Sequence, residues 1–198
     1  FKKIFLYHLR RSIMFIQTED TPNPETLKFI PGNVILKSGT ADFSGKEASS
    51  DSPLASRLFE IDGVSRVFLA TDFISVTKVP HLDWNTLKPE ILTGIMEHFS
   101  TGLPSINDSE NKEFEQNNNE DSETIKQIKD LLETRVRPAV AMDGGDITFC
   151  SFVSGVVTLQ MKGACAGCPS STATLKMGIE NMLRHYIPEV TEVRAAEL

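Results

Sequence analysis

The chain has 198 residues, of which 40% are apolar, so it is long enough to form one large or two small domains. It contains no run of about 18 apolar residues and no basic stripe, so neither a membrane nor a nucleic acid is an expected partner. Three cysteines, only two of them close together, do not form an extracellular disulfide framework and indicate a reducing compartment.

The first 13 residues carry basic side chains at Lys2, Lys3, Arg10 and Arg11 and no acidic residue. They are mixed with large apolar residues, as in a basic amphipathic targeting segment. An upstream extension before Met14 explains them equally well. We therefore assign residues 1–13 as an extension or targeting remnant and leave both interpretations open.

Residues 14–104 are predicted to form one small domain. The strand-like runs are 15–18, 26–30, 64–70 and 73–78. Helices are predicted to begin at Ser52, which precedes a proline, and at Asp83. The order strand, strand, helix, strand, strand, helix indicates an α+β domain with an antiparallel sheet. His81 and His98 are isolated and form no catalytic set, so the domain is interpreted as a binding or docking module.

Residues 105–123 are rich in Asn, Glu and Ser, and seven acids face one base, Lys112. Such a segment buries too little apolar surface to offset its ordering entropy, so it is predicted to be a disordered acidic linker. An acidic docking tail is the functional alternative. The net charge of −7 is therefore concentrated here, and the rest of the chain is close to neutral.

Residues 124–198 are predicted to form a second small domain, also with a mainly antiparallel sheet. A helix is expected from Thr124 to Arg137-Pro138, followed by a turn over 143–146. We favour this turn as a structural element with glycines at special φ angles over an iron site. The later elements are a hairpin of 147–152 and 156–161, a helix through 175–186, and a short strand at 190–193.

The hairpin leads into the loop Gly163-Ala164-Cys165-Ala166-Gly167-Cys168-Pro169, where two thiols are separated by two residues. Gly163 and Gly167 supply the φ angles that a tight turn needs. Pro169 suits the first position of a helix, so Cys168 is predicted to be its N-cap. The thiols would then face helix amides, which favour the thiolate form.

Three chemistries use such a pair. A thioredoxin-like dithiol needs a strand before it and a helix after it, and both are predicted here. A structural zinc site needs four protein ligands, and this pair supplies two of them. An iron-sulfur cluster takes four thiolates, so one chain supplies half a set and two copies would complete it.

Two further side chains could extend the zinc set. His185 lies about five helical turns beyond Cys168, too far for the same metal, and is interpreted as a surface residue. Cys150 falls inside a strand and is interpreted as a small buried apolar residue. Neither is assigned a ligand role.

Longer patterns add a resemblance. The segments Arg137-Pro138, 142–147, 163–171, Thr174-Leu175-Lys176 and Ile179-Glu180 resemble the NifU C-terminal domain of the Nfu family. The segments Gln17-Thr18-Glu19 and 21–29 resemble that family's N-terminal domain. Both predicted domains are covered, and only residues 1–13 and the linker lie outside.

The resemblance implies a scaffold or carrier, not an enzyme, that binds a labile [4Fe-4S] cluster between two protomers. Only Cys165 and Cys168 carry over as cluster ligands. The implied partners are a second copy of the chain, client apoproteins and upstream cluster-assembly proteins. The implied location is the bacterial cytoplasm or the mitochondrial matrix. A thiol-disulfide oxidoreductase that cycles the same two thiols is the alternative.

Overall fold

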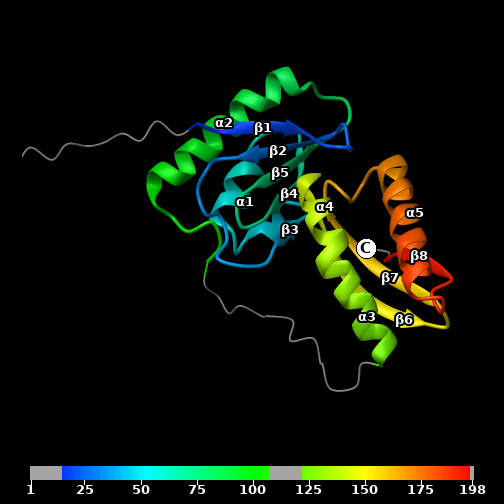
Figure 1. Cartoon of the computed structure of the whole chain (residues 1–198). Helices are drawn as coiled ribbons and strands as arrows, with labels where there is room; N and C mark the ends of the chain where they lie inside the picture. Colours follow the sequence, from blue (N-terminus) through cyan, green and yellow to red (C-terminus); the bar gives the residue numbers. More distant parts are fainter. Residues whose placement is uncertain (1–14, 108–121, 197–198) are drawn as a thin grey trace, which may run out of the picture.

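The computed structural model describes residues 15–107 and 122–196, and it confirms an α+β fold with two mainly antiparallel sheets (Figure 1). The predictions for residues 1–13 and for most of the linker concern residues outside these ranges. No helix in the described residues combines the length and the apolar character needed to cross a bilayer.

The first domain holds a five-stranded sheet in the order β1-β2-β5-β4-β3, in which every neighbouring pair is antiparallel. Its elements are β1 (Gln17–Asp20), β2 (Thr26–Ile30), β3 (Ala41–Phe43), the 3₁₀ turn η1 (Glu47–Ser49), α1 (Pro53–Leu58), β4 (Val64–Leu69), β5 (Ile74–Lys78) and α2 (Trp84–Thr101). Alternate residues of the central strands, such as Phe29, Val67 and Val76, pack in one core with α1 and α2.

Both helices of the first domain begin where cap chemistry predicts. The Ser52 hydroxyl accepts a hydrogen bond from the amide of Ala55, and Pro53 opens α1. Asp83 caps α2 in the same way through the amide of Asn85, and Gly102 ends that helix with φ of 70°. These start signals are local, which explains why the sequence identifies them.

The second domain holds a three-stranded sheet in the order β6-β7-β8, with an antiparallel hairpin and one parallel pair. Its elements are α3 (Glu123–Leu131), the π turn η2 (Leu132–Val136), α4 (Arg137–Met142), β6 (Gly145–Val153), β7 (Val156–Gly163), α5 (Pro169–Tyr186) and β8 (Glu192–Ala195). The helices pack on the sheet around residues such as Ile128, Leu159 and Leu183. This core is separate from that of the first domain.

Several elements differ from the predictions. The first strand runs over Gln17–Asp20 and not 15–18, and the last strand runs over Glu192–Ala195 and not 190–193. A short strand, β3, which was not predicted, pairs with β4. The helix predicted to end at Arg137-Pro138 continues to Met142. A π turn precedes it, in which the amide of Arg137 donates to the carbonyl of Leu132, and this wider turn accommodates the proline.

The ends of the predicted linker belong to the folded parts. The carbonyl of Ser105 accepts a hydrogen bond from the Ser52 hydroxyl at 2.6 Å, and Ile106 packs against the first core. Glu123 is the first residue of α3, whose cap is Ser122. Residues 108–121 lie outside the described ranges.

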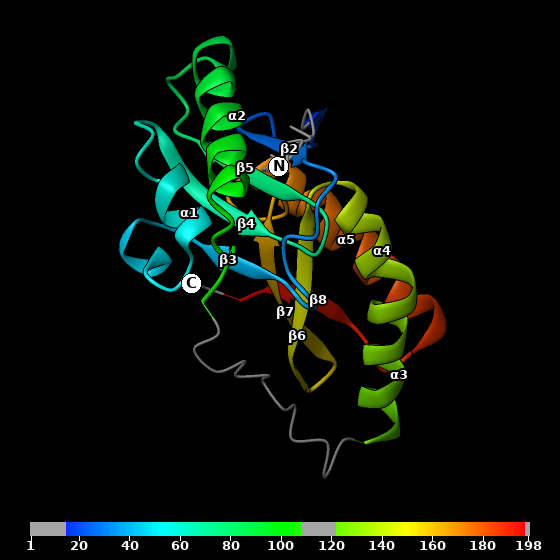
Figure 2. The same cartoon turned by 90° about the vertical axis from the view of Figure 1, so that its left-hand side faces the viewer.

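The two domains contact each other directly. Figure 2 shows the first sheet between α1 and α2 on one side and the second domain on the other. The hairpin of the second domain approaches β4 and β5, and a small cluster of Phe68, Ala70 and Phe73 packs against Ala141 of α4. The face of the first sheet that its own helices leave open is therefore covered by the second domain.

Candidate functional site

The cysteine loop joins β7 to α5 as a tight turn closed by its own backbone. The amide of Cys165 donates to the carbonyl of Lys162 at 3.3 Å, and that of Ala166 donates to the carbonyl of Gly163 at 3.1 Å. Gly163 and Gly167 have φ angles of 59° and 84°, in the left-handed region that glycine adopts without strain. The prediction that both glycines serve the turn is confirmed.

Cys168 is the N-cap of α5, as the sequence predicts, with φ −108° and ψ 112°. Its carbonyl accepts the first helical hydrogen bond from the amide of Thr172 at 3.0 Å. The Thr172 hydroxyl in turn donates to the carbonyl of Cys165 at 3.0 Å. One threonine thus holds both ends of the Cys-x-x-Cys turn against the start of the helix, where the dipole is positive.

Cys165 is far more buried than the loop position suggests. Its side chain is 6% exposed and belongs to the core of the second domain, whereas Cys168 is half-buried. Burial, followed by the negative charges of Asp143 and Asp146, raises the pKa of the Cys165 thiol to about 12. The expectation that helix amides favour the thiolate at both cysteines is therefore wrong for Cys165.

The turn at 143–146 lies directly beside Cys165. Gly144 has φ 82°, and a Cβ atom built on Gly145 would lie 2.4 Å from the Cys165 sulfur, so glycine is needed for this approach. The Asp146 carboxylate is occupied: it accepts hydrogen bonds from Arg137, Thr40 and the amide of Ile147. The turn therefore has the structural role that we favoured.

An apolar cavity of about 580 Å³ opens next to Cys165, between the helical segment η2–α4 and α5. Arg135 and Asp143 supply its charged groups, and Pro22 reaches it from the first domain. The remaining lining residues are Val136, Ala139, Val140, Ala164, Cys165, Thr174, Leu175, Gly178, Ile179 and Met182. The sequence does not reveal this cavity, because its walls come from segments that meet only in the folded chain.

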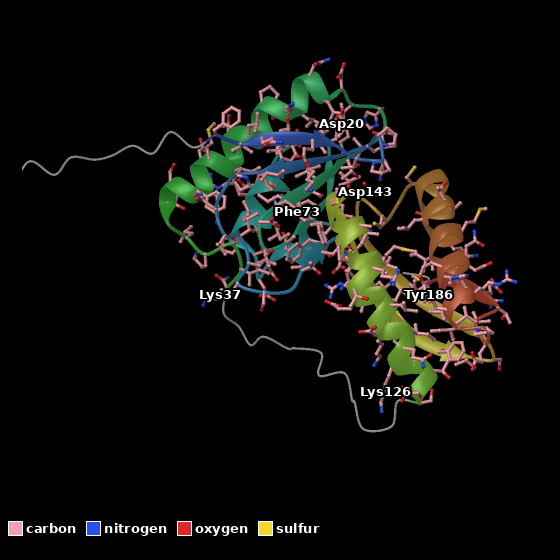
Figure 3. All side chains as sticks on the ribbon, in the orientation of Figure 1. Asp20, Lys37, Phe73, Lys126, Asp143 and Tyr186 are labelled. Atoms are coloured by element: carbon pink, nitrogen blue, oxygen red, sulfur yellow. The ribbon has the colours of Figure 1, made fainter. Side chains whose placement is uncertain are left out.

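The first domain also contacts the cysteine loop, which the sequence analysis missed. The side-chain amide of Asn23 donates to the carbonyl of Ala166 at 3.3 Å, and the Ser75 hydroxyl donates to the carbonyl of Gly144 at 2.6 Å. Figure 1 shows the connection between β1 and β2 beside the chain that links β7 to α5. Figure 3 shows Phe73 and Asp143 on the two sides of this junction.

The other candidate residues lie away from the loop or outside any ligand set. Cys150 is exposed, so its assignment as a buried residue is wrong. It sits at a β-bulge, where the pairing of β6 with β7 shifts between Phe149 and Ser151. His185 is exposed on α5, as predicted. Within the described residues, no three His, Cys, Asp or Glu side chains are placed to hold a metal ion.

Comparison with known proteins identifies two family domains. The family described as "Scaffold protein Nfu/NifU N terminal" matches residues 16–102, and the family "NifU-like domain" matches residues 128–194. Together the two matches include both sheets and the cysteine loop.

Curated relatives match nearly the whole chain. The human mitochondrial "NFU1 iron-sulfur cluster scaffold homolog" is 52% identical over 188 residues, which cover 94% of this chain and 73% of that protein. "NifU-like protein 4, mitochondrial" of Arabidopsis thaliana is 50% identical over 188 residues, 93% of this chain and 66% of that protein. The chain spans about two thirds of the length of such relatives.

Among solved structures, the solution NMR structure of a NifU-like protein from Saccharomyces cerevisiae is similar to part of the chain. It is 26% identical, with a TM-score of 0.44, and the match covers 49% of this chain and 87% of that one.

Proposed function

Because this chain belongs to the Nfu family of NifU-like proteins, we propose that it is an iron-sulfur cluster scaffold and carrier. It binds a labile [4Fe-4S] cluster between two protomers and transfers it to client apoproteins. The observation that carries this proposal is the pair of thiols on one glycine turn at the start of α5, in a chain 52% identical to a protein named as a cluster scaffold.

The donor set supports a shared cluster. Iron-sulfur clusters are held by cysteine thiolates, four in the usual case. In the described part of this chain, Cys150 is exposed on β6, remote in the sequence from the loop, and no group of three potential ligands forms. Cys165 and Cys168 are then half of a set, and a second copy of the chain supplies the other half.

The surroundings of the two thiols fit such a cargo. The loop carries small residues at Ala164, Ala166 and Gly167, so its own side chains do not crowd the two sulfurs. The positive end of the α5 dipole lies at Cys168 and offsets negative charge on a bound cluster. The cavity beside Cys165 has a mainly apolar lining, and the apolar surroundings of a cluster tune its properties.

The partners and the location follow from the same proposal. The partners are a second protomer, client apoproteins and upstream cluster-assembly proteins. The names of the curated relatives place those proteins in mitochondria, which favours the mitochondrial matrix for this chain. The first domain then serves as a docking module, and no catalytic role is assigned to it.

The alternative, a thiol-disulfide oxidoreductase, needs an accessible thiolate that attacks a disulfide. In this structure Cys165 is 6% exposed, and burial together with the charges of Asp143 and Asp146 raises its pKa to about 12. Both properties oppose that role for Cys165. The raised pKa does not oppose a carrier, because iron binding displaces the proton of a coordinating thiol.

Anaerobic reconstitution with iron and sulfide tests the proposal. Iron, sulfide, the visible spectrum and the molecular mass are measured together on the same sample. We expect about four irons and four sulfides per dimer, with broad visible absorption. Cys165→Ala and Cys168→Ala should each remove the colour, whereas the matched control Cys150→Ala should retain it. A colourless monomer whose two thiols oxidise reversibly would refute the carrier and support the oxidoreductase.

A further inference from the structure

The turn between β1 and β2, residues Thr21 to Pro24, lies on the cysteine loop. The side chain of Asn23 is 2% exposed and acts in two directions. Its Oδ1 accepts a hydrogen bond from the amide of Glu25 at 3.0 Å, which shapes the turn, and its Nδ2 donates to the carbonyl of Ala166 at 3.3 Å. Ala166 lies between the two cysteines, so the first domain contacts the loop at its centre.

The face of the first sheet adds two polar contacts next to this turn. The Lys28 ammonium donates to the carbonyls of Ala141 and Met142, at 3.2 and 3.0 Å, at the C-terminal end of α4. A cation there satisfies carbonyls that the helix leaves without partners. The Ser75 hydroxyl donates to the carbonyl of Gly144 in the next turn.

An aromatic contact completes the surface that covers the loop. Phe68 is fully buried, and a Cβ built on Gly163 would lie 2.8 Å from its ring. Phe73 lies beside Phe68, with ring centroids 5.9 Å apart, and the Lys28 ammonium stands 4.7 Å from the centre of the Phe73 ring. We call these residues, Asn23, Lys28, Phe68, Phe73 and Ser75, the covering surface.

Each domain has its own core, so separation of the two domains would leave both cores in place. The core of the first domain contains only its own residues, and so does the core of the second. Among the apolar clusters of the described residues, the one around Phe68 and Phe73 crosses the boundary, where it meets Ala141. The polar contacts can exchange to water when the domains part, so that opening costs much less than unfolding.

We propose that the first domain is a reversible cover for the cysteine loop, and that Cys165 becomes available only when the covering surface leaves the loop. The purpose of the cover rests on the proposed function. A cluster shared with a second chain requires both thiols to face out of the protomer. Here Cys165 is 6% exposed, and Pro22 of the first domain lines the same cavity as Cys165. Asn23 holds the carbonyl of Ala166, between the two cysteines, so loading requires the cover to open.

The test is the alkylation rate of Cys165 in the reduced, full-length protein without iron, with iodoacetamide as the probe and fragment-ion mass spectrometry to assign each cysteine. The opening variant is Asn23→Asp with Ser75→Ala. The aspartate at position 23 keeps an oxygen that accepts from the amide of Glu25, but its carboxylate faces the Ala166 carbonyl, and two acceptors repel each other. The alanine at position 75 removes the hydroxyl that donates to the carbonyl of Gly144. We expect Cys165 to react at least about tenfold faster in this variant, since two buried hydrogen bonds are lost.

The matched control is Asn33→Asp with Ser38→Ala, the same chemical changes at exposed positions of the first domain. Cys165 should react there at the wild-type rate, and the exposed Cys150 should react equally in all proteins. If circular dichroism shows that the opening variant is unfolded, Lys28→Met is the second variant. It keeps an unbranched apolar side chain and removes the ammonium group that donates to both carbonyls of α4. A Cys165 rate unchanged in a folded opening variant would overturn the proposal.

A second arm separates this proposal from the function on which it rests. The opening variant and its control are reconstituted with iron and sulfide, and the rate of cluster formation is compared. Faster loading in the opening variant alone supports the role of the cover. Faster alkylation with unchanged loading would overturn that role. If no protein binds a cluster, the proposed function fails, while the alkylation rates still decide whether the cover exists.

Discussion

Arg137 and Asp146 form a two-point ion pair that ties the start of α4 to the start of β6 beside the cysteine loop. The Nε and Nη2 atoms of Arg137 donate to the two carboxylate oxygens of Asp146 at 2.8 and 3.0 Å. The Thr40 hydroxyl of the first domain donates to the same carboxylate at 2.9 Å. Asp146 is 5% exposed, so this pair holds the turn that contacts Cys165.

The first prediction concerns this pair. Asp146→Asn removes the negative charge to which the Arg137 guanidinium and the Thr40 hydroxyl donate hydrogen bonds. We expect the free energy of unfolding to fall by about 1 to 3 kcal/mol. The loss should be smaller than for a fully buried ion pair, because Arg137 is partly exposed. The matched control is Glu133→Gln, which removes an exposed partner of the same arginine and should cost less than about 0.5 kcal/mol. Urea unfolding followed by circular dichroism measures both, and equal effects would contradict the prediction.

The second prediction separates the two glycines of the loop. Gly163→Ala sets a methyl group 2.8 Å from both the carbonyl oxygen of Gly144 and the Phe68 ring, at a strained φ of 59°. Gly167→Ala is strained by its φ of 84°, but no atom lies within 4 Å of the added carbon. We expect a loss of about 1 kcal/mol at Gly167 and a clearly larger one at Gly163. Similar midpoints of thermal unfolding for the two variants would refute the steric argument.

The third prediction compares the stabilities of serine variants at Cys165 and Cys150. Cys165 lies in the core, so Cys165→Ser buries a hydroxyl and is expected to destabilise the protein by about 1 to 3 kcal/mol. Cys150→Ser changes an exposed side chain and should stay within about 0.5 kcal/mol of wild type. Chemical unfolding of the iron-free proteins measures the difference. A Cys165→Ser variant as stable as Cys150→Ser would show that Cys165 is exposed in solution.

The fourth prediction is a pH dependence of stability from His98. Its side chain is 1% exposed, its Nε2 has no hydrogen-bond partner in the described structure, and burial, followed by the charge of Arg57, lowers its pKa. The unfolded chain binds the proton of His98 more tightly than the folded chain does. The stability that depends on a neutral His98 is therefore fully present above about pH 6.5 and falls as the pH drops below that value. Urea unfolding between pH 7.5 and 5.5 should show this fall in wild type.

A variant isolates the contribution of that histidine. In His98→Leu the imidazole cannot be protonated, so the stability should change less over the same pH range than it does in wild type. The exposed His81 provides the control, and His81→Leu should retain the wild-type slope. A slope unaffected by His98→Leu would assign the pH dependence to other groups.

Several features of the site could be predicted from the sequence because they depend on near neighbours. A proline after Cys168 and glycines at 163 and 167 indicate a tight turn leading into a helix, and the structure has that turn. Caps at Ser52 and Asp83 are similarly local. Cys150 was assigned wrongly because a strand pattern assumes regular pairing, and the bulge beside it interrupts that pairing.

The sequence by itself determined the two α+β domains, the family and the pair of thiols, since each follows from residue types at short spacing. The tertiary structure alone decided the environment of those thiols. The burial of Cys165, its raised pKa and the contact of its loop with the first domain depend on atoms from α4, β6 and the turn at Asn23. These segments are distant in the sequence and meet in the folded structure. Burial and hydrogen bonding between distant segments leave no periodic pattern in the sequence, so the sequence alone did not reveal them.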